Sequence, residues 1–271
     1  MRQEEAEGIA REILSALESG RQIEPFSLRR PSFSTRDAYA VTAILRRLRE
    51  EEGAAQIGRK IGFTNRGIWA EYGVYEPIWG DVYDTTASEV PADGVIRVLH
   101  LPEPRIEPEI VLGLADDLHP GMDERDILGA LAWVAHGFEI VQSVFPGWRF
   151  AAADCIANGG LHGALFVGPR LAIHGRDRDG LFKALPSFSI TLHGDGEKVD
   201  AGKGANVLDG PLSALKHLAE VLARDDLNPP LRAGELVTTG TLTRAFPVAA
   251  GEKWSTTLSG IDLPGLAVTI G

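Results

Sequence analysis

The chain has 271 residues, of which 44% are hydrophobic and 24% are charged, a balance typical of a globular protein with a buried core. This composition excludes a disordered chain, and the modest content of 31 Gly and 16 Pro excludes a collagen-like one. The 38 acidic residues against 27 basic residues give a net charge of −11, which disfavours nucleic acid as a partner because phosphate backbones are repelled.

The first fifty-odd residues predict a pair of helices. Apolar residues recur at helical spacing over residues 4–19, and Gly20 is a typical helix stop. A second helix is expected to begin after Ser34, which can form a capping box with Asp37, and to end at Gly53. We therefore assign residues 1–58 to an N-terminal helical segment.

Residues 59–271 predict a β-rich catalytic domain, because short apolar runs there are punctuated by Gly, Pro and Asp. Strands are expected over residues 56–63, 94–101, 105–114, 138–143, 164–168, 188–193, 235–242 and 266–270. Helices are expected at about 123–135 and 211–223. Since strands outnumber helices and do not alternate with them, the pattern favours a β-rich, mixed α+β fold over a doubly wound α/β fold.

Two glutamates on one expected strand are the most informative chemical signal. Alternate residues of a strand share a face, so Glu107 and Glu109 should point the same way. Buried carboxylates repel each other, and a hard cation such as Mg²⁺ or Mn²⁺ would cancel that repulsion. The alternative is a pair of solvated glutamates on the polar face of the strand. Pro108 between them favours an edge or an irregular strand position, where sites often lie.

Glu139 and Lys60 are further candidates, each with a structural alternative. Glu139 lies in the apolar run 137–141, where an acidic side chain is costly unless it is paired or binds a metal, although it could instead face solvent. Together with Glu107 and Glu109 it would form a three-carboxylate site, with metal coordination positions left open for water and a chelating substrate. Lys60, followed by Ile61 and Gly62, could bind a substrate carboxylate or transfer a proton, or could be a surface lysine.

The order and spacing of these residues resemble a known family. The matching segments are Lys60-Ile61-Gly62-x-Thr64, Tyr72-Gly73-Val74-x-Glu76-Pro77, Glu107-x-Glu109, Glu139, Thr239-Gly240 and Pro247-Val248. Over essentially its whole length the chain resembles the 2-keto-4-pentenoate hydratase / 4-oxalocrotonate decarboxylase branch of the fumarylacetoacetate hydrolase superfamily. The resemblance implies a β-rich, mixed-sheet fumarylacetoacetate hydrolase-like fold with an N-terminal helical segment.

The resemblance also implies a chemistry. Glu107, Glu109 and Glu139 would hold one Mg²⁺ or Mn²⁺, which stabilises the enolate of a small-molecule 2-oxo acid substrate. The expected activity is that of a metal-dependent lyase, a hydratase of a 2-hydroxy-2,4-dienoate as in aromatic meta-cleavage degradation. The alternatives are 2-oxo-3-hexenedioate decarboxylation, acylpyruvate C–C hydrolysis, and a catalytically silent partner subunit. Lys60 matches the family lysine near the substrate carboxylate, and Thr241 resembles the loop that contacts the substrate.

Two stretches depart from the family pattern. Relatives commonly have Pro-Asp-Phe-Gly where this chain has Pro-Ile-Trp-Gly at residues 77–80, so Trp79 is expected in the substrate pocket of a larger or less polar substrate. Relatives also tend to have Asp-Asn-Ala-Ser-Ser at residues 158–162, where His162 replaces a serine. His162 could act as an acid or base, or could pack at a glycine-rich turn. His136, expected at a helix end beside Gly137, is interpreted as structural.

Location and partners can also be predicted. No apolar run approaches the roughly 18 residues of a membrane span, and the N-terminus lacks a signal-peptide pattern, so a cytoplasmic protein without a membrane partner is expected. Cys155 is the only cysteine, which excludes an intrachain disulfide and indicates a small apolar filler. A homo-oligomer is expected, and a second enzyme of the same pathway is a candidate partner.

Overall fold

The computed structural model describes residues 1–271, apart from the side chains of Ile68, Glu71 and Tyr72, so the motif residue Tyr72 lies outside the described side chains. The α-helices are α1 (Gln3–Ser19), α2 (Phe26–Arg29), α3 (Thr35–Glu51), α4 (Trp69–Tyr72), α5 (Glu124–Gly129), α6 (Ala152–Ala157), α7 (Arg178–Ser187) and α8 (Pro211–Leu222). Short 3₁₀ helices are η1 (Arg66–Ile68), η2 (Pro146–Trp148), η3 (Gly159–Leu161), η4 (Gly175–Asp177) and η5 (Gly204–Asn206).

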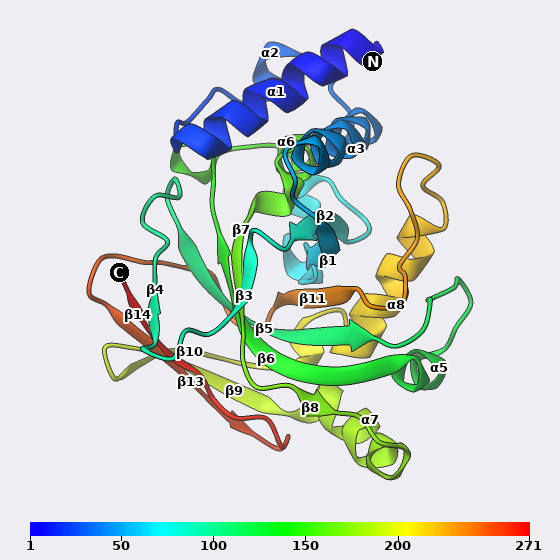
Figure 1. Ribbon diagram of the computed structural model, residues 1–271, viewed down its shortest axis with the longest axis vertical. Helices are drawn as coiled ribbons and strands as arrows, with labels where there is room; N and C mark the ends of the chain where they lie inside the picture. The colour runs from blue at the N-terminus through cyan, green and yellow to red at the C-terminus, as the bar shows by residue number, and fades with distance from the viewer.

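The strands form two mixed sheets, of which the larger runs through the middle of the molecule and the smaller lies toward the lower left of the view in Figure 1. The strands are β1 (Gln56–Gly62), β2 (Ile78–Tyr83), β3 (Ala87–Glu89), β4 (Val95–Ile96), β5 (Arg105–Leu114), β6 (Leu131–Val141), β7 (His162–Val167), β8 (Leu171–Ala172), β9 (Ser189–Gly194), β10 (Glu197–Lys203), β11 (Leu236–Thr241), β12 (Phe246–Pro247), β13 (Lys253–Ser259) and β14 (Ala267–Ile270). The larger sheet has the order β2-β1-β11-β5-β6-β7-β3, with β12 beside β5 and β8 beside β6, and the smaller has the order β10-β9-β13-β14-β4. Parallel and antiparallel pairs occur in both sheets, which confirms the predicted mixed-sheet α+β fold.

The N-terminal helices form as the sequence predicts. Ser34 and Asp37 make the expected capping box, with the Asp37 N–H donating to Ser34 Oγ at 3.2 Å, and Gly20 ends α1 with a φ of 65°. Figure 1 shows α1, α3 and α6 together at one end of the molecule. Apolar side chains of α1 and α3 share one core cluster with Phe145 and Ile156 of the β-rich part. The division into residues 1–58 and 59–271 remains a proposal. In the described part of the chain, no helix has the length and apolarity needed to cross a membrane.

The expected helix over residues 123–135 is wrong in its second half. A helix does begin after Asp123, whose side chain caps it, but α5 ends at Gly129 and residues 131–141 form β6. The apolar run 130–135 is the reason, because a fully buried strand and a buried helix cannot be separated by hydrophobic periodicity. His136 is therefore a strand residue and meets no helix dipole.

Other elements differ because their local signals are weak. The strand expected over 94–101 shrinks to β4, whereas β2, β13, α6 and α7 were not predicted. Gly80 and Asp81 interrupt the apolar pattern of β2, although all six of its residues are buried. Burial on both faces removes the alternation by which a half-buried strand is recognised.

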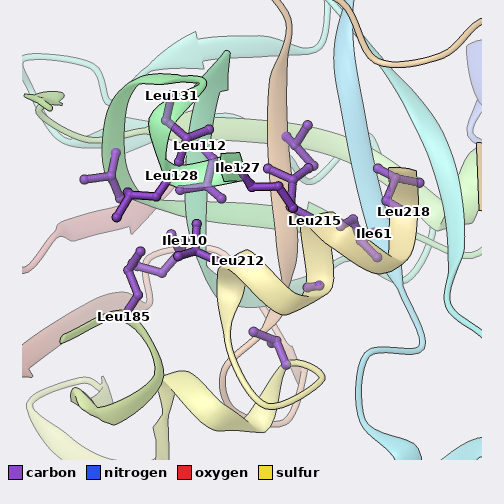
Figure 2. Close-up of a cluster of buried hydrophobic side chains, with 14 of the residues drawn as sticks. Ile61, Ile110, Leu112, Ile127, Leu128, Leu131, Leu185, Leu212, Leu215 and Leu218 are labelled. Carbon is purple, nitrogen blue, oxygen red and sulfur yellow. The ribbon is translucent and has the colours of Figure 1, made fainter. Parts of the chain in front are cut away.

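The largest core cluster fixes the strands that carry the candidate site. Figure 2 shows Leu212 and Leu215 of α8 facing Ile110 and Leu112 of β5, with Ile61 of β1 beside them. Ile110 and Leu112 are fully buried, as the alternation of β5 predicts. Because their face is held in the core, the opposite face of β5, which carries the two glutamates, is fixed as well.

A buried ionic network ties α3 to the large sheet. Arg46 of α3 and Arg59 of β1 both contact Asp81 of β2, at 3.3 Å and 3.2 Å, and Arg59 also contacts Glu235 at 3.1 Å. Arg46 donates a further hydrogen bond to Asn228 at 2.6 Å. Arg59 is fully buried, so its guanidinium depends on these carboxylates for compensation.

We expect Asp81→Ala to lower the free energy of unfolding by about 3–5 kcal/mol, because it breaks two buried ion pairs at once and leaves the Arg59 guanidinium with the Glu235 carboxylate alone among the described residues. Urea denaturation measures this change. The matched control is Asp179→Ala, which breaks the solvent-exposed pair with Arg125 and should leave the free energy of unfolding nearly unchanged. Equal effects of the two substitutions would contradict a structural role for the buried network.

Candidate metal centre and active site

The pairing of β5 with β6 brings the three candidate glutamates together. Glu107 lies directly opposite Glu139 across the two strands, and Glu109 lies opposite Gly137. One carboxylate oxygen from each of the three glutamates lies within 4.8 Å of the others. Glu109 and Glu139 are fully buried, and Glu107 is half-buried, so the alternative of solvated strand glutamates does not hold.

A break in the regular pairing of β11 with β5 provides a backbone hydrogen bond to the carboxylate of Glu109. The β5–β11 register shifts between Thr238 and Thr241, and Gly240 has a φ of 99° at the shift. The Gly240 N–H donates to Glu109 Oε2 at 2.9 Å. A Cβ at Gly240 would lie 2.1 Å from Thr64 Oγ1, so the turn requires glycine.

Pro108 fits this bulge. Its carbonyl accepts a hydrogen bond from the Leu242 N–H at 2.9 Å, so its ring nitrogen also faces the side of β5 on which the pairing with β11 is irregular. A missing N–H on this side costs no hydrogen bond of the regular strand pairing. The prediction that Pro108 marks an irregular position is therefore confirmed.

Burial and mutual repulsion shift the ionisation of the cluster. Burial raises the pKa of Glu109 well above its usual value, and burial together with the charge of Glu139 raises the pKa of Glu107 to about 7. Burial acts in the same direction on Glu139, but Lys60 and His162 outweigh it and lower the pKa of that carboxyl. The positive side chains nearby are therefore too few to keep all three glutamates ionised, and an additional cation would favour the ionised form of each.

Lys60 is a buried member of the same cluster rather than a surface lysine. It lies in the middle of β1, and its Nζ is 3.4 Å from Glu139 Oε2 and donates to the Gly160 carbonyl at 3.0 Å. Burial alone would lower the pKa of Lys60, but the charges of the three glutamates outweigh it and raise the pKa. Lys60 is thus an ammonium at neutral pH, suited to binding an anion or donating a proton.

The donor set fits a hard divalent cation. Glu109 Oε1 and Glu139 Oε2 are buried and have no hydrogen-bond partner among the described residues. Buried oxygens of this kind are expensive unless something satisfies them. Carboxylate-only donors suit Mg²⁺ or Mn²⁺ rather than a soft metal, so the residues present match the predicted cofactor.

A cavity of about 690 Å³ opens onto this cluster. Among the predicted site residues, Lys60, Glu107 and Thr241 line it. Cys155 also lines it, and burial raises the pKa of its thiol to about 12, which leaves it a neutral, apolar wall residue as expected.

Trp79 is not part of the cavity wall. Its side chain is fully buried in the core and stacks on Tyr39, with ring centroids 5.0 Å apart, while the Arg59 guanidinium lies 5.4 Å from its ring. The preceding residue, Ile78, lines the cavity instead. Successive strand residues point to opposite faces, so the unrecognised strand β2 explains the misplaced expectation.

The two histidines have different surroundings. His162, the first residue of β7, contacts Glu139 Oε1 through Nδ1 at 2.8 Å but does not line the large cavity. His136 is buried, and its ring nitrogens contact the Glu109 carbonyl at 2.9 Å and Thr256 Oγ1 at 2.8 Å. Burial lowers the pKa of His136 to about 4, so it is neutral and supports the backbone of β5, in line with the predicted structural role.

Several cavity residues were not predicted from the sequence. Arg105, Arg244, Asp200 and Asn206 all line the cavity. Arg105 could have been found, because it shares the strand face of Glu107 two residues away. The other three come from segments distant in sequence, and no local pattern distinguishes them.

Comparisons with known proteins agree with this geometry. No family model matches the chain. It is 30% identical over 258 residues to the 2-hydroxyhexa-2,4-dienoate hydratase of Comamonas testosteroni, with 95% of each chain covered. It is 32% identical over 232 residues to the 4-oxalocrotonate decarboxylase of Pseudomonas putida, covering 85% of this chain and 84% of that relative. The chain belongs to the 2-keto-4-pentenoate hydratase / 4-oxalocrotonate decarboxylase family.

Solved structures show which fold the chain adopts. The structure is similar to 4-oxalocrotonate decarboxylase from Pseudomonas putida G7 complexed with magnesium and adipate, with a TM-score of 0.91, 27% identity, and coverage of 100% of this chain and 99% of that one. A fumarylacetoacetate isomerase/hydrolase-type protein from Oleispira antarctica shares the fold at a TM-score of 0.55 and 16% identity, over 79% of this chain and 94% of that one. The chain therefore has a fumarylacetoacetate hydrolase-like fold, as predicted.

We expect the triple variant Glu107→Gln, Glu109→Gln, Glu139→Gln to lose Mg²⁺ and Mn²⁺ binding. Removing direct carboxylate ligands should weaken binding by more than the roughly 10- to 100-fold typical of losing an outer partner. Isothermal titration calorimetry measures the affinities. The matched control is Asp200→Asn, a cavity carboxylate outside the cluster, which should bind both ions as the parent does. Undiminished binding by the triple variant would refute the metal centre.

Proposed function

We propose that the protein is a divalent-metal-dependent hydratase of a 2-hydroxy-2,4-dienoate. The observation that carries this proposal is a cluster of three glutamates beside a buried ammonium at the wall of a 690 Å³ cavity, in which Glu109 and Glu139 are fully buried and each has one carboxylate oxygen without a hydrogen-bond partner among the described residues. A bound Mg²⁺ or Mn²⁺ would supply Lewis-acid stabilisation of the negative charge that develops on the 2-oxygen of the substrate. Glu107, Glu109 and Glu139 are the residues that would hold it.

The reaction has two stages that the surrounding residues can serve. The dienol first becomes a 2-oxo-enoate, as its hydroxyl loses a proton and C5 gains one, and water then adds OH to C4 and H to C3. Lys60 is held by the Gly160 carbonyl and Glu139, so its ammonium has a fixed direction from which to bind the substrate carboxylate or donate a proton. Thr241 and the aromatic residues Trp148 and Phe150 line the space beside it.

Hydrolysis of an acylpyruvate receives less support. That reaction would need a water molecule activated in the cavity beside a carboxylate or a histidine. His162, the candidate for this role, contacts Glu139 and does not line the cavity. The homo-oligomeric assembly, the partner enzyme of the same pathway and the cytoplasmic location are proposals that rest on the sequence and on the family resemblance.

We expect the purified protein with Mg²⁺ or Mn²⁺ to consume 2-hydroxypenta-2,4-dienoate, which is measured as a loss of the ultraviolet absorbance of this substrate. Chelation of the metal by EDTA should stop the reaction. Lys60→Met should lower kcat/KM by about 10²- to 10⁴-fold, the range for losing a positioned proton donor. Lys183→Met, which changes an exposed lysine of α7, is the matched control and should retain full activity.

Absence of turnover on a panel of dienoates and 2-oxo acids would overturn the hydratase proposal. If metal binding were intact in that experiment, the result would favour a catalytically silent partner subunit. Full activity of Lys60→Met would leave the hydratase assignment in place and remove Lys60 from it.

One observation favours a second candidate, decarboxylation of a 2-oxo-3-hexenedioate. Arg105 is half-buried on the cavity wall, on the strand face of Glu107, and its guanidinium lies 4.1 Å from the Trp148 ring centroid. Among the described residues no carboxylate lies within ion-pair distance of Arg105, although its charge acts on the Glu107 carboxyl and partly offsets the rise in the pKa of that group. Alternate residues on a strand are about 7 Å apart, so this free charge suits the second carboxylate of an extended dioate.

We expect Arg105→Met to lower kcat/KM for the dioate by about 10- to 100-fold, as loss of a hydrogen bond to a charged group costs about 1.5–3 kcal/mol. Turnover of the monocarboxylic dienoate should change little. Arg244→Met is the matched control, because Arg244 lines the same cavity but is already paired with Asp200 at 3.1 Å. Equal losses for both substrates would show that Arg105 does not select a second carboxylate.

A further inference from the structure

We propose that His162 is a positioning residue, which holds Glu139 so that Oε2 is directed at the metal centre. The inference rests on the metal centre of the proposed function. It assigns to the residue that replaces the family serine a role outside the substrate cavity.

The contacts of Glu139 divide its two oxygens between two tasks. His162 Nδ1 lies 2.8 Å from Glu139 Oε1, and since a carboxylate only accepts, Nδ1 carries the hydrogen and donates it. Glu139 Oε2 has no hydrogen-bond partner among the described residues and lies 3.4 Å from Lys60 Nζ. The terminal torsion of a glutamate is soft, so without the His162 bond the carboxylate could rotate.

The imidazole is itself held in place. Its Nε2 lies 2.9 Å from Thr86 Oγ1, in the turn between β2 and β3. Thr86 is anchored twice, because its Oγ1 accepts from the Tyr83 N–H at 3.2 Å and its carbonyl accepts from the Leu165 N–H at 2.8 Å. A continuous chain of contacts therefore runs from the backbone of this turn through the ring to the carboxylate of Glu139.

His162 is separated from the substrate space. Its side chain is buried, and it lines a distinct cavity of about 40 Å³ together with Thr86, Gln142 and Asn158. The 690 Å³ cavity is lined by Lys60 and Gly160 on that side, without His162. The ring thus acts on the reaction through Glu139 and not by touching the substrate.

Two substitutions separate donation to Glu139 from simple packing. In His162→Asn the side-chain amide nitrogen can occupy the place of Nδ1 and keep the bond to Glu139. In His162→Gln the amide takes the place of Nε2, which keeps the Thr86 contact and loses the Glu139 bond. We expect His162→Gln to weaken Mn²⁺ binding by about 10- to 100-fold and His162→Asn to bind within a few-fold of the parent. Titration calorimetry and Mn²⁺ electron paramagnetic resonance measure both affinities.

Thermal unfolding without metal checks that both His162 variants are folded. Thr86→Val tests the same positioning role without changing His162. Removing the Thr86 hydroxyl frees the ring and should weaken Mn²⁺ binding severalfold, even if a His162 variant fails to fold. Parent-like Mn²⁺ affinity in His162→Gln or in Thr86→Val, or equal losses in His162→Asn and His162→Gln, would overturn the positioning role. Glu139→Gln distinguishes this failure from that of the metal centre: its own parent-like affinity would overturn the centre itself.

Discussion

The crowding of three carboxylates at one point of a sheet, two of them fully buried, is the constraint that the rest of the site satisfies. Each buried charge loses hydration worth several kcal/mol, and Glu107 and Glu139 face each other directly across β5 and β6. Lys60 supplies one positive charge, and the Gly240 N–H supplies one hydrogen bond. Three carboxylates and one ammonium leave a formal charge of −2, which a single divalent cation would neutralise. The electrostatics of the cluster therefore select the charge of the ion as well as its donor type.

The surrounding fold keeps this costly arrangement from relaxing. β5 lies between β6 and β11 in the large sheet, and its apolar face is packed against α8. Arg59, the neighbour of Lys60 on β1, points into the ionic network with Asp81 and Glu235, so two adjacent basic residues serve opposite faces of one strand. The Lys60 ammonium can then approach the glutamates only from a fixed direction. Preorganisation of this kind is what allows a charged site to stabilise developing charge without first reorganising.

Much of this site is visible in the sequence, and the reasons differ by residue. The strand period places Glu107 and Glu109 on one face, and the apolar run around Glu139 marks that glutamate as exceptional. The sequence does not show that the three glutamates meet, because this depends on how β6 pairs with β5. The sequence pattern also predicts a helix for the first half of β6. Trp79 was misplaced for a related reason: without recognising β2 as a strand, the face to which each of its residues points cannot be assigned. Partners such as Thr86, which meet the site through long-range packing, leave no local pattern.

The position of His162 changes what the family departures mean. If the residue lay in the cavity, its replacement of a serine would alter contacts with the substrate. Because it contacts the outer oxygen of Glu139, the replacement instead alters the support of the metal centre, while the cavity retains Lys60 and Thr241 as its polar wall. Similarly, Trp79 packs against Tyr39 and leaves Ile78 at the cavity surface. Under the proposed function, substrate selection would then depend on residues such as Arg105, whose charge lies on the cavity wall where it could meet the second carboxylate of a dioate.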